Sequence, residues 1–282
     1  MEILDIRGKF AMCVSTEFNT VESMAIKARK TSGSKLKLIK NDPWLAPFAG
    51  AIEGRHHDAV AKEAELTSGC GSLTDFANAH RYFGLHRLDD GSWVFREWAP
   101  NAVEIVLVGD FSRWERRTEY ALRPIGGGVW EGRFPADAMS HGQFYKMHVS
   151  WAGGSGERIP AYAVRVVQAE NSPIFSAQVW APEKPYKWKR KRFVPKTDPL
   201  LIYECHIGMA QDKEGVGTYT EFKDKILPRI ARDGYNCIQI MAIQEHPYYG
   251  SFGYHVSSFF AASSKFGTPE ELKALIDEAH RL

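Results

Sequence analysis

The sequence is organised around the stretch Cys237-Ile-Gln-Ile-Met-Ala-Ile-Gln-Glu-His-Pro-Tyr-Tyr-Gly-Ser-Phe-Gly-Tyr254. Its first part, Cys237 to Ile243, is a short apolar run that only Gln239 interrupts. Such a run, rich in β-branched residues, predicts a strand buried on both faces, as in a parallel sheet. Polar, aromatic and glycine residues follow it, and parallel α/β folds build ligand sites at this end of a strand. We therefore expect a ligand-binding loop over residues 244–254.

The segments around this stretch alternate between strand and helix patterns. Leu200 to Ile207 reads as a second buried strand, and Thr220 to Asp233 as a helix that contains Pro228. Thr268-Pro-Glu-Glu271 is a capping box that opens another helix. Strand, helix, strand and helix predict two βα units. Because two such units do not close a domain, we expect residues 198–282 to be an incomplete α/β domain.

The sequence pattern changes over residues 82–180, where short runs of strand-forming residues alternate with turn residues. Asp89-Asp-Gly91 lies between two of these runs and predicts a hairpin. The spacing predicts an antiparallel β-sandwich. The expected fold is thus multidomain β plus α/β: an undetermined extension at 1–34, a helical segment at 35–81, the sandwich, a linker at 181–197, and the βα units.

Composition limits the classes of partner. The chain has 282 residues, 25% of them charged, and its net charge is +2. That balance gives no reason to expect nucleic acid or a membrane surface as a partner, and we interpret the basic run Lys187 to Arg192 as a solvated linker face rather than a phosphate site. No apolar run reaches the ~18 residues of a membrane span, and no secretory signal is recognisable, so we expect a cytoplasmic protein.

The cysteines and acidic residues do not predict a metal site. None of the cysteines forms a Cys-x-x-Cys pair, and no third ligand is spaced to complete a set with Glu245 and His246. We therefore expect no metal, and because the sequence has no phosphate loop and no dinucleotide fingerprint it gives no reason to expect a nucleotide cofactor.

Tryptophan is concentrated in the sandwich region, which holds Trp93, Trp98, Trp114, Trp130, Trp151 and Trp180. An indole can fill a core, or it can bind the apolar C–H face of a sugar. Alternation along a strand places Trp93 and Trp98 on opposite faces, so one of them need not be in the core. Trp114 follows the turn-like stretch Gly109-Asp-Phe-Ser-Arg113 and is the best candidate for exposure. Core filling and sugar stacking remain open on composition alone.

From about Leu36 to Leu282 the chain resembles the 1,4-alpha-glucan (glycogen) branching enzymes of eukaryotic-like type, in the α-amylase superfamily. The motifs that carry the resemblance are Asn41-Asp-Pro-Trp-Leu-Ala-Pro-Phe48, Tyr82-Phe-Gly-Leu-His-Arg87, Glu97-Trp-Ala-Pro100, Gly109-Asp-Phe-Ser-Arg-Trp114, His141-Gly-Gln-Phe-Tyr-Lys146, Ile202-Tyr-Glu-Cys-His-Ile-Gly208 and Ser251 to Leu272.

The resemblance implies a helical segment, a glycogen-binding sandwich of immunoglobulin-like type and the first two βα units of a (β/α)8 barrel. It implies a retaining transfer of an α-1,4-glucan chain to a glucose 6-hydroxyl, with glycogen or maltooligosaccharides as partners and a monomeric full-length enzyme. The catalytic residues are expected beyond Leu282. The implied glucan contacts are Trp98, Ala99, Pro100, Trp114, Gly126, Gly127, Gly128, Val129 and Lys146, with Gly69 and Cys70 as a looser match, and Glu245, His246 and Tyr254 lining the cleft.

Two other functions stay open. The chain could be a stand-alone glucan-binding module with a remnant of a barrel, or a fragment of a debranching glycoside hydrolase. The match from Ser251 to Leu272 favours branching over debranching.

Overall fold

The structure is a computed structural model that describes residues 36–67, 71–194 and 199–282. The predicted extension at 1–34 and the proposed contacts Gly69 and Cys70 lie outside these residues. The chain divides into two compact units, Met1–Ala79 and His80–Leu282.

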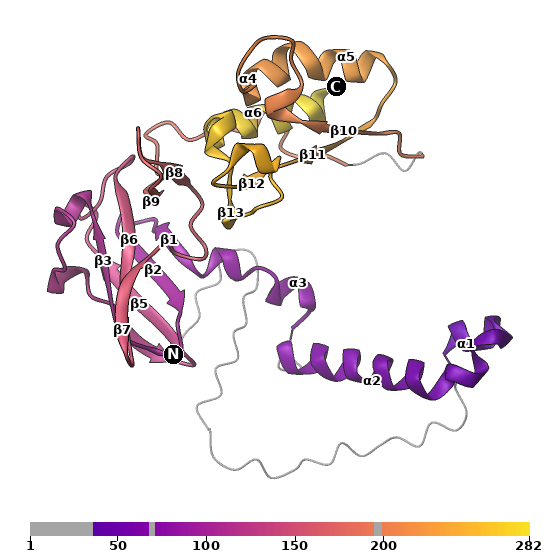
Figure 1. Ribbon diagram of the computed structural model, residues 1–282, viewed down its shortest axis with the longest axis horizontal. Helices are drawn as coiled ribbons and strands as arrows, with labels where there is room; N and C mark the ends of the chain where they lie inside the picture. The colour runs from indigo at the N-terminus through magenta and orange to yellow at the C-terminus, as the bar shows by residue number, and fades with distance from the viewer. Residues whose placement is uncertain (1–35, 68–70, 195–198) are drawn as a thin grey trace. The chain divides into compact units, whose positions relative to one another are not determined.

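The first unit is helical in its described part, as the sequence predicts. It contains α1 (Lys37–Asn41), the 3-10 helix η1 (Pro43–Phe48), α2 (Ala49–Leu66) and α3 (Leu73–Phe76) (Figure 1). The side chain of Asp42 accepts a hydrogen bond from the Trp44 amide at 3.0 Å, and Pro43 occupies the first helical turn, so this start follows the expected cap chemistry.

The second unit begins with the predicted antiparallel sandwich (Figure 1). One sheet has the order β1-β2-β5-β4, with bounds β1 (Gly84–Arg87), β2 (Trp93–Trp98), β4 (Arg123–Gly126) and β5 (Val129–Phe134). The other has the order β3-β6-β9-β8, with β7 paired to β6, and its bounds are β3 (Ala102–Gly109), β6 (Phe144–Trp151), β7 (Gly154–Arg158), β8 (Val166–Gln168) and β9 (Phe175–Gln178).

Side chains of both sheets form one core, to which Trp93 and Phe95 contribute from β2, and Ile105 and Leu107 from β3. The predicted hairpin at Asp89 to Gly91 joins β1 to β2, with Arg87 paired to Trp93. These buried aromatic and branched side chains supply most of the sandwich's hydrophobic stabilisation.

The remaining part contains one parallel strand pair and its helices. β10 (Ile202–His206) pairs in parallel with β11 (Cys237–Met241), and β12 (Gln244–Glu245) pairs antiparallel with β13 (Ser258–Ala262). Between β10 and β11 lie α4 (Tyr219–Glu221), the π-helical turn η6 (Phe222–Ile226) and α5 (Leu227–Arg232), and α6 (Pro269–Arg281) closes the chain. Short 3-10 turns are η2 (Ala79–Arg81), η3 (Asp110–Ser112), η4 (Thr118–Tyr120), η5 (Ile207–Met209), η7 (Tyr249–Ser251) and η8 (Ser264–Phe266).

The prediction that these two strands are buried on both faces is wrong. Ile202 is 48% exposed and Tyr203 37%, and Gln239 of β11 is also exposed. Within the described residues β10 and β11 pair only with each other, and their core partners come from one side, from α4, η6, α5 and α6. A two-stranded sheet with helices on one face leaves the other face open.

The expected solvated linker is attached to α6. The carboxylate of the buried Asp277 accepts hydrogen bonds from the Tyr186 hydroxyl at 2.7 Å and from the amides of Lys189 at 2.7 Å and Arg190 at 2.9 Å. The backbone of the basic run is thereby fixed, while its cationic side chains remain exposed, as expected.

Candidate functional site

Trp98, at the end of β2, presents an exposed indole. The alternation predicted for β2 is confirmed, because Trp93 is 3% exposed and Trp98 is 59% exposed. The indole Nε1 of Trp98 donates a hydrogen bond to the carbonyl of Gly127 at 3.1 Å, which fixes the orientation of the ring. A ring held in place loses little conformational entropy when a ligand stacks on it.

A turn of three glycines supports Trp98. Gly126, Gly127 and Gly128 have φ values of 102°, 60° and 80°, a region that side chains with a Cβ rarely adopt. A Cβ at Gly128 would lie 2.8 Å from the Cβ of Pro100 and 3.1 Å from the Trp98 Nε1. The Ala99 amide donates to the Gly128 carbonyl at 2.8 Å. The structure thus brings together seven of the predicted contacts, which we call the Trp98 platform: Trp98, Ala99, Pro100, Gly126, Gly127, Gly128 and Val129.

Trp114 is presented by a tight turn at the end of β3. Arg113 and Trp114 both have left-handed φ values, 57° and 61°. The side chain of Asp110 holds the turn, because its Oδ1 accepts from the Trp114 Nε1 at 2.9 Å and its Oδ2 from the Phe144 amide at 2.7 Å. Trp114 is 40% exposed, as the turn-like sequence predicts. Two strained residues and a shared carboxylate hold one indole at the surface, a cost that is typical of functional positions.

Trp114 borders a pocket of about 270 Å³ on the second sheet. Its lining is mainly apolar, with one cation and one carboxylate: Trp114, Phe144, Lys146, Glu157, Val167, Ala169, Ile174 and Ser176. The Lys146 Nζ lies 6.0 Å from the centre of the Trp114 ring and 3.0 Å from the Glu157 carboxylate. We call this the Trp114 pocket. An aromatic wall beside charged hydrogen-bonding groups suits a sugar, which has an apolar face and a hydroxyl rim.

The Trp98 platform and the Trp114 pocket lie on different sheets. The Trp98 platform belongs to β2, β5, the end of β4 and the adjoining turns, whereas the Trp114 pocket is built on β6, β7, β8 and β9 and their neighbouring loops. The sequence identifies residues of both surfaces but does not show that they form two separate surfaces. Sequence reasoning also missed six lining residues of the Trp114 pocket, because the pairing of strands β6 to β9 brings them in: Phe144, Glu157, Val167, Ala169, Ile174 and Ser176.

The loop after β11 exposes one predicted residue and buries two. Tyr254 is 77% exposed, while Glu245 and His246 have no exposed surface. Glu245 Oε2 accepts a hydrogen bond from the Ser264 amide at 2.6 Å, and its Oε1 accepts from the His246 amide at 3.1 Å. In this structure the side chain of Glu245 therefore joins the loop to Ser264, and the buried side chains of Glu245 and His246 do not reach the surface.

His206, at the end of β10, is buried beside His246. Neither ring nitrogen of His206 has a hydrogen-bond partner among the described residues, and aromatic rings surround it. Burial, and then the nearby His246 ring, lowers the pKa of His206 below its usual value. The neutral ring is therefore the form that the fold favours.

Acidification is expected to destabilise the second unit through His206. Because its folded pKa lies below the unfolded value of about 6.5, the unfolded chain binds more protons, and stability is lost as pH falls from about 6.5 through the folded pKa. Urea unfolding of the parent and of His206→Gln at pH 7.5 and 5.5 measures this. We expect a smaller loss in the variant, and equal losses would exclude His206 as the cause.

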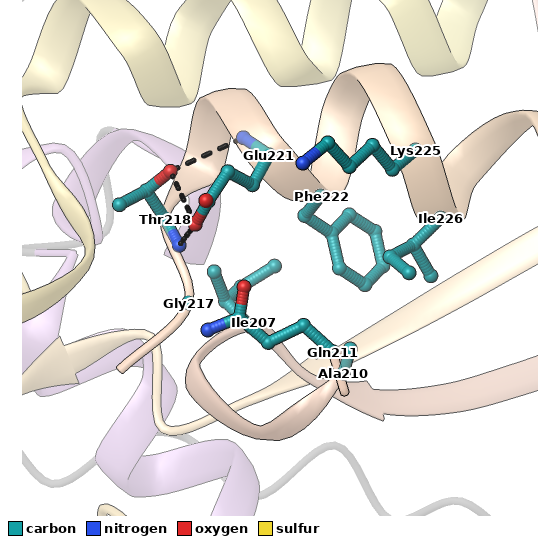
Figure 2. Close-up of a pocket in the computed structure, with 9 residues that line it drawn as sticks. All are labelled: Ile207, Ala210, Gln211, Gly217, Thr218, Glu221, Phe222, Lys225 and Ile226. Atoms are coloured by element: carbon teal, nitrogen blue, oxygen red, sulfur yellow. Dashed lines mark hydrogen bonds between the residues drawn. The ribbon is translucent and has the colours of Figure 1, made fainter. Parts of the chain in front are cut away.

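A second, small pocket lies between η5 and α4 (Figure 2). Ile207, Phe222 and Ile226 line it, and the Thr218–Glu221 capping box closes one side. Its volume is about 20 Å³, room for about one water. This pocket is too small to bind a sugar.

The structure also bears on metals and membranes. In residues 36–67, 71–194 and 199–282, no group of three or more His, Cys, Asp or Glu side chains gathers in a way that would hold a metal ion. No helix in the part of the chain that the structure describes has both the length and the apolar character to cross a bilayer.

Comparison with known proteins identifies the relatives of the chain. Residues 82–163 match the model of carbohydrate-binding module 48, described as an isoamylase N-terminal domain. The 1,4-alpha-glucan-branching enzyme of Dictyostelium discoideum is 42% identical over 261 residues, covering 90% of this chain and 38% of the relative. That of Yarrowia lipolytica is 43% identical over 260 residues, covering 87% of this chain and 36% of the relative. This chain therefore spans well under half the length of these relatives.

Solved structures agree on the fold. The pullulanase from Bacillus acidopullulyticus superposes with a TM-score of 0.58 at 16% identity, covering 71% of this chain and 28% of that one. The likeness shows that this chain shares its β-rich fold with that structure over the superposed part. The resemblance to 1,4-alpha-glucan-branching enzymes inferred from the sequence is confirmed by the relatives over about nine-tenths of the chain.

Proposed function

We propose that this chain is the N-terminal part of a 1,4-alpha-glucan-branching enzyme, and that its sandwich binds α-glucan on the Trp98 platform and in the Trp114 pocket. The observation that carries the proposal is the Trp114 pocket, where a fixed, exposed indole faces a lysine and a carboxylate across an apolar hollow. The match of residues 82–163 to a carbohydrate-binding module supports it.

The chemistry of the complete enzyme would be a retaining transfer. A carboxylate nucleophile cleaves an α-1,4 link and forms a glycosyl-enzyme, and a second carboxyl group protonates the leaving oxygen. That group then deprotonates the 6-hydroxyl of an acceptor glucose, which gives an α-1,6 branch. The chemistry requires no cofactor.

We place both carboxylates outside residues 1–282, on later strands of a (β/α)8 barrel that β10 and β11 begin. Glu245, at the C-terminal side of β11, is fully buried and accepts hydrogen bonds from two backbone amides, so it is not available to attack a sugar. The share of the relatives' length that this chain covers is consistent with this placement.

Removing either exposed indole is expected to weaken glucan binding. Trp98→Ala should weaken the free energy of glucan binding at the Trp98 platform by about 1–3 kcal/mol, and Trp114→Ala should do the same in the Trp114 pocket. In each case the stacked face of the sugar returns to water. The two losses should be independent, since the rings lie on different sheets and share no partner. Calorimetric titration with maltoheptaose measures both.

Trp188→Ala is the matched control, because Trp188 is 43% exposed but belongs to neither surface. We expect it to bind like the parent. Unchanged affinity in folded Trp98→Ala and Trp114→Ala variants would contradict the proposal.

The 282-residue chain is expected to bind amylose without branching it. The expected result is no rise in the α-1,6 anomeric proton signal when amylose is incubated with the chain. A rise above the boiled-protein control would show that the chain carries its own catalytic carboxylates.

The two rival functions make different predictions. If the chain is a stand-alone glucan-binding module, joining it to the remaining strands of a branching-enzyme barrel should give no transfer activity. A debranching hydrolase would release linear chains from glycogen. A cytoplasmic location and a monomeric full-length enzyme stay predictions.

A further inference from the structure

Tyr248 is an exposed aromatic residue whose position is fixed by its own loop. It is 65% exposed, yet its ring lies against the backbone of Gly250. A Cβ at Gly250 would lie 2.5 Å from both the Cζ and the Oη of Tyr248. Gly250 does not have a positive φ, so this close approach is the reason why a glycine is needed there.

Hydrogen bonds within the loop fix Tyr248 and Tyr254 at opposite ends of one turn. The carbonyl of Tyr248 accepts from the Ser251 amide at 3.1 Å and from the Ser251 hydroxyl at 2.7 Å. The Ser251 carbonyl in turn accepts from the Tyr254 amide at 3.0 Å. The turn η7 is thus a framework that carries one exposed tyrosine on each side.

The base of the loop is held against the end of β11. Phe252 and Ala242 have left-handed φ values of 52° and 56°, and Gly253 packs directly on Ala242. Strained residues of this kind persist only where the surrounding structure fixes them. The loop therefore holds its side chains in a preset arrangement.

Neighbouring tyrosines in this loop point in opposite directions. Tyr249 packs edge-on against the buried His206 ring, with centres 6.0 Å apart, and burial raises the pKa of its hydroxyl. Tyr249 therefore serves as an anchor. Among the residues that the structure describes, the Tyr248 ring packs on no other aromatic ring, and it is exposed.

We propose that Tyr248 is a sugar-stacking residue of this loop, and that it binds the α-glucan chain beside Tyr254, which the resemblance to branching enzymes places in the lining of the cleft. An aromatic ring already fixed against Gly250 gives up little freedom on binding, and its open side can pack on the C–H face of a pyranose. The role would be positioning of the chain along the cleft. This inference rests on the proposed function, because it takes α-glucan as the ligand.

The test uses the 282-residue chain with labelled tyrosine rings and maltoheptaose as the probe. The ring signals of Tyr248, assigned by their absence in Tyr248→Phe, should shift on titration together with those of Tyr254. Gly250→Ala keeps the tyrosine but displaces its ring. We expect it to raise the dissociation constant reported by Tyr254 about three- to tenfold, as for Tyr248→Ala, whereas Tyr248→Phe should stay within about twofold of the parent.

Gly54→Ala is the matched control, because a Cβ there would meet nothing within 4 Å. It should leave the Tyr254 signals and their titration unchanged. If maltoheptaose binds the sandwich tryptophans but leaves the Tyr248 signals unmoved, or if Gly250→Ala binds like the parent, the role of Tyr248 is overturned and the proposed function stands. If no tryptophan or tyrosine signal moves, both are overturned.

Discussion

Replacing Arg165 by methionine is expected to lower the free energy of unfolding of the His80–Leu282 unit by about 1–3 kcal/mol, because a buried hydrogen bond from a charged donor is lost. Arg165 is 8% exposed, and its Nη1 donates to the Gly267 carbonyl at 2.6 Å. The guanidinium also lies over the Trp180 ring, 5.2 Å from its centre. These contacts join the sandwich region to the turn that precedes α6.

The size of the effect follows from the charges around Arg165. Burial lowers the pKa of Arg165, and the nearby Glu245, Glu271 and Glu270 carboxylates act in the opposite direction. Glu245 has no exposed surface, so removing the cation leaves a buried carboxylate without that compensation. The Gly267 carbonyl also loses its charged donor, and a buried polar group without a partner destabilises the folded state.

Arg158→Met is the control for Arg165→Met. Arg158 also lies over an indole, 5.2 Å from the centre of Trp151, but it is exposed. Its removal should cost less than about 1 kcal/mol. Urea unfolding followed by fluorescence measures both variants, and equal losses would contradict the account of Arg165.

Phe266→Ala is expected to lower the free energy of unfolding by about 3–5 kcal/mol, because it leaves a cavity in the core under β10 and β11. Phe266 has no exposed surface, and its ring centre lies 5.5 Å from His206, 5.8 Å from Tyr219 and 6.1 Å from His246. The buried cluster there is small, with members Cys205, Ile207, Tyr219, Phe222, Leu227, Ile230, Phe266 and Leu275. One large cavity therefore removes a large share of its packing.

Hydrogen exchange distinguishes where Phe266→Ala acts. Amides of β10 and β11 should lose protection, while those of β2, β3 and β6 in the sandwich should keep it, because the two buried clusters share no member. Phe259→Ala is the control, since Phe259 is 72% exposed. Uniform loss of protection in both halves would show that the clusters unfold as one.

Local chemistry made much of the fold predictable. The alternation of Trp93 and Trp98, the Asp89 to Gly91 turn and the Thr268 capping box depend on neighbouring residues, and each forms as expected. Pro228 also affects the local structure, but the sequence did not predict the π-helical turn that accommodates this proline. The π-helical turn Phe222–Ile226 precedes it, in the region where a proline removes a helical hydrogen bond.

Features that depend on distant residues were not predictable from the sequence. Nothing near Asp277 indicates that it fixes residues 186–190, and nothing near Arg165 indicates Gly267 as its partner. The same limit applies to the site. The resemblance identified Trp98, Trp114 and Lys146, but only the pairing of strands separates them into two surfaces.

The most direct test of glucan binding by the sandwich follows the indole N–H signals of the eight tryptophans during titration with maltoheptaose. Binding at the two surfaces predicts shifts for Trp98 and Trp114, whose indoles lie in them, and unmoved signals for the buried Trp93 and Trp130. A saturable shift confined to Trp98 and Trp114 would support the proposal. Unmoved Trp98 and Trp114 signals at millimolar maltoheptaose would contradict it.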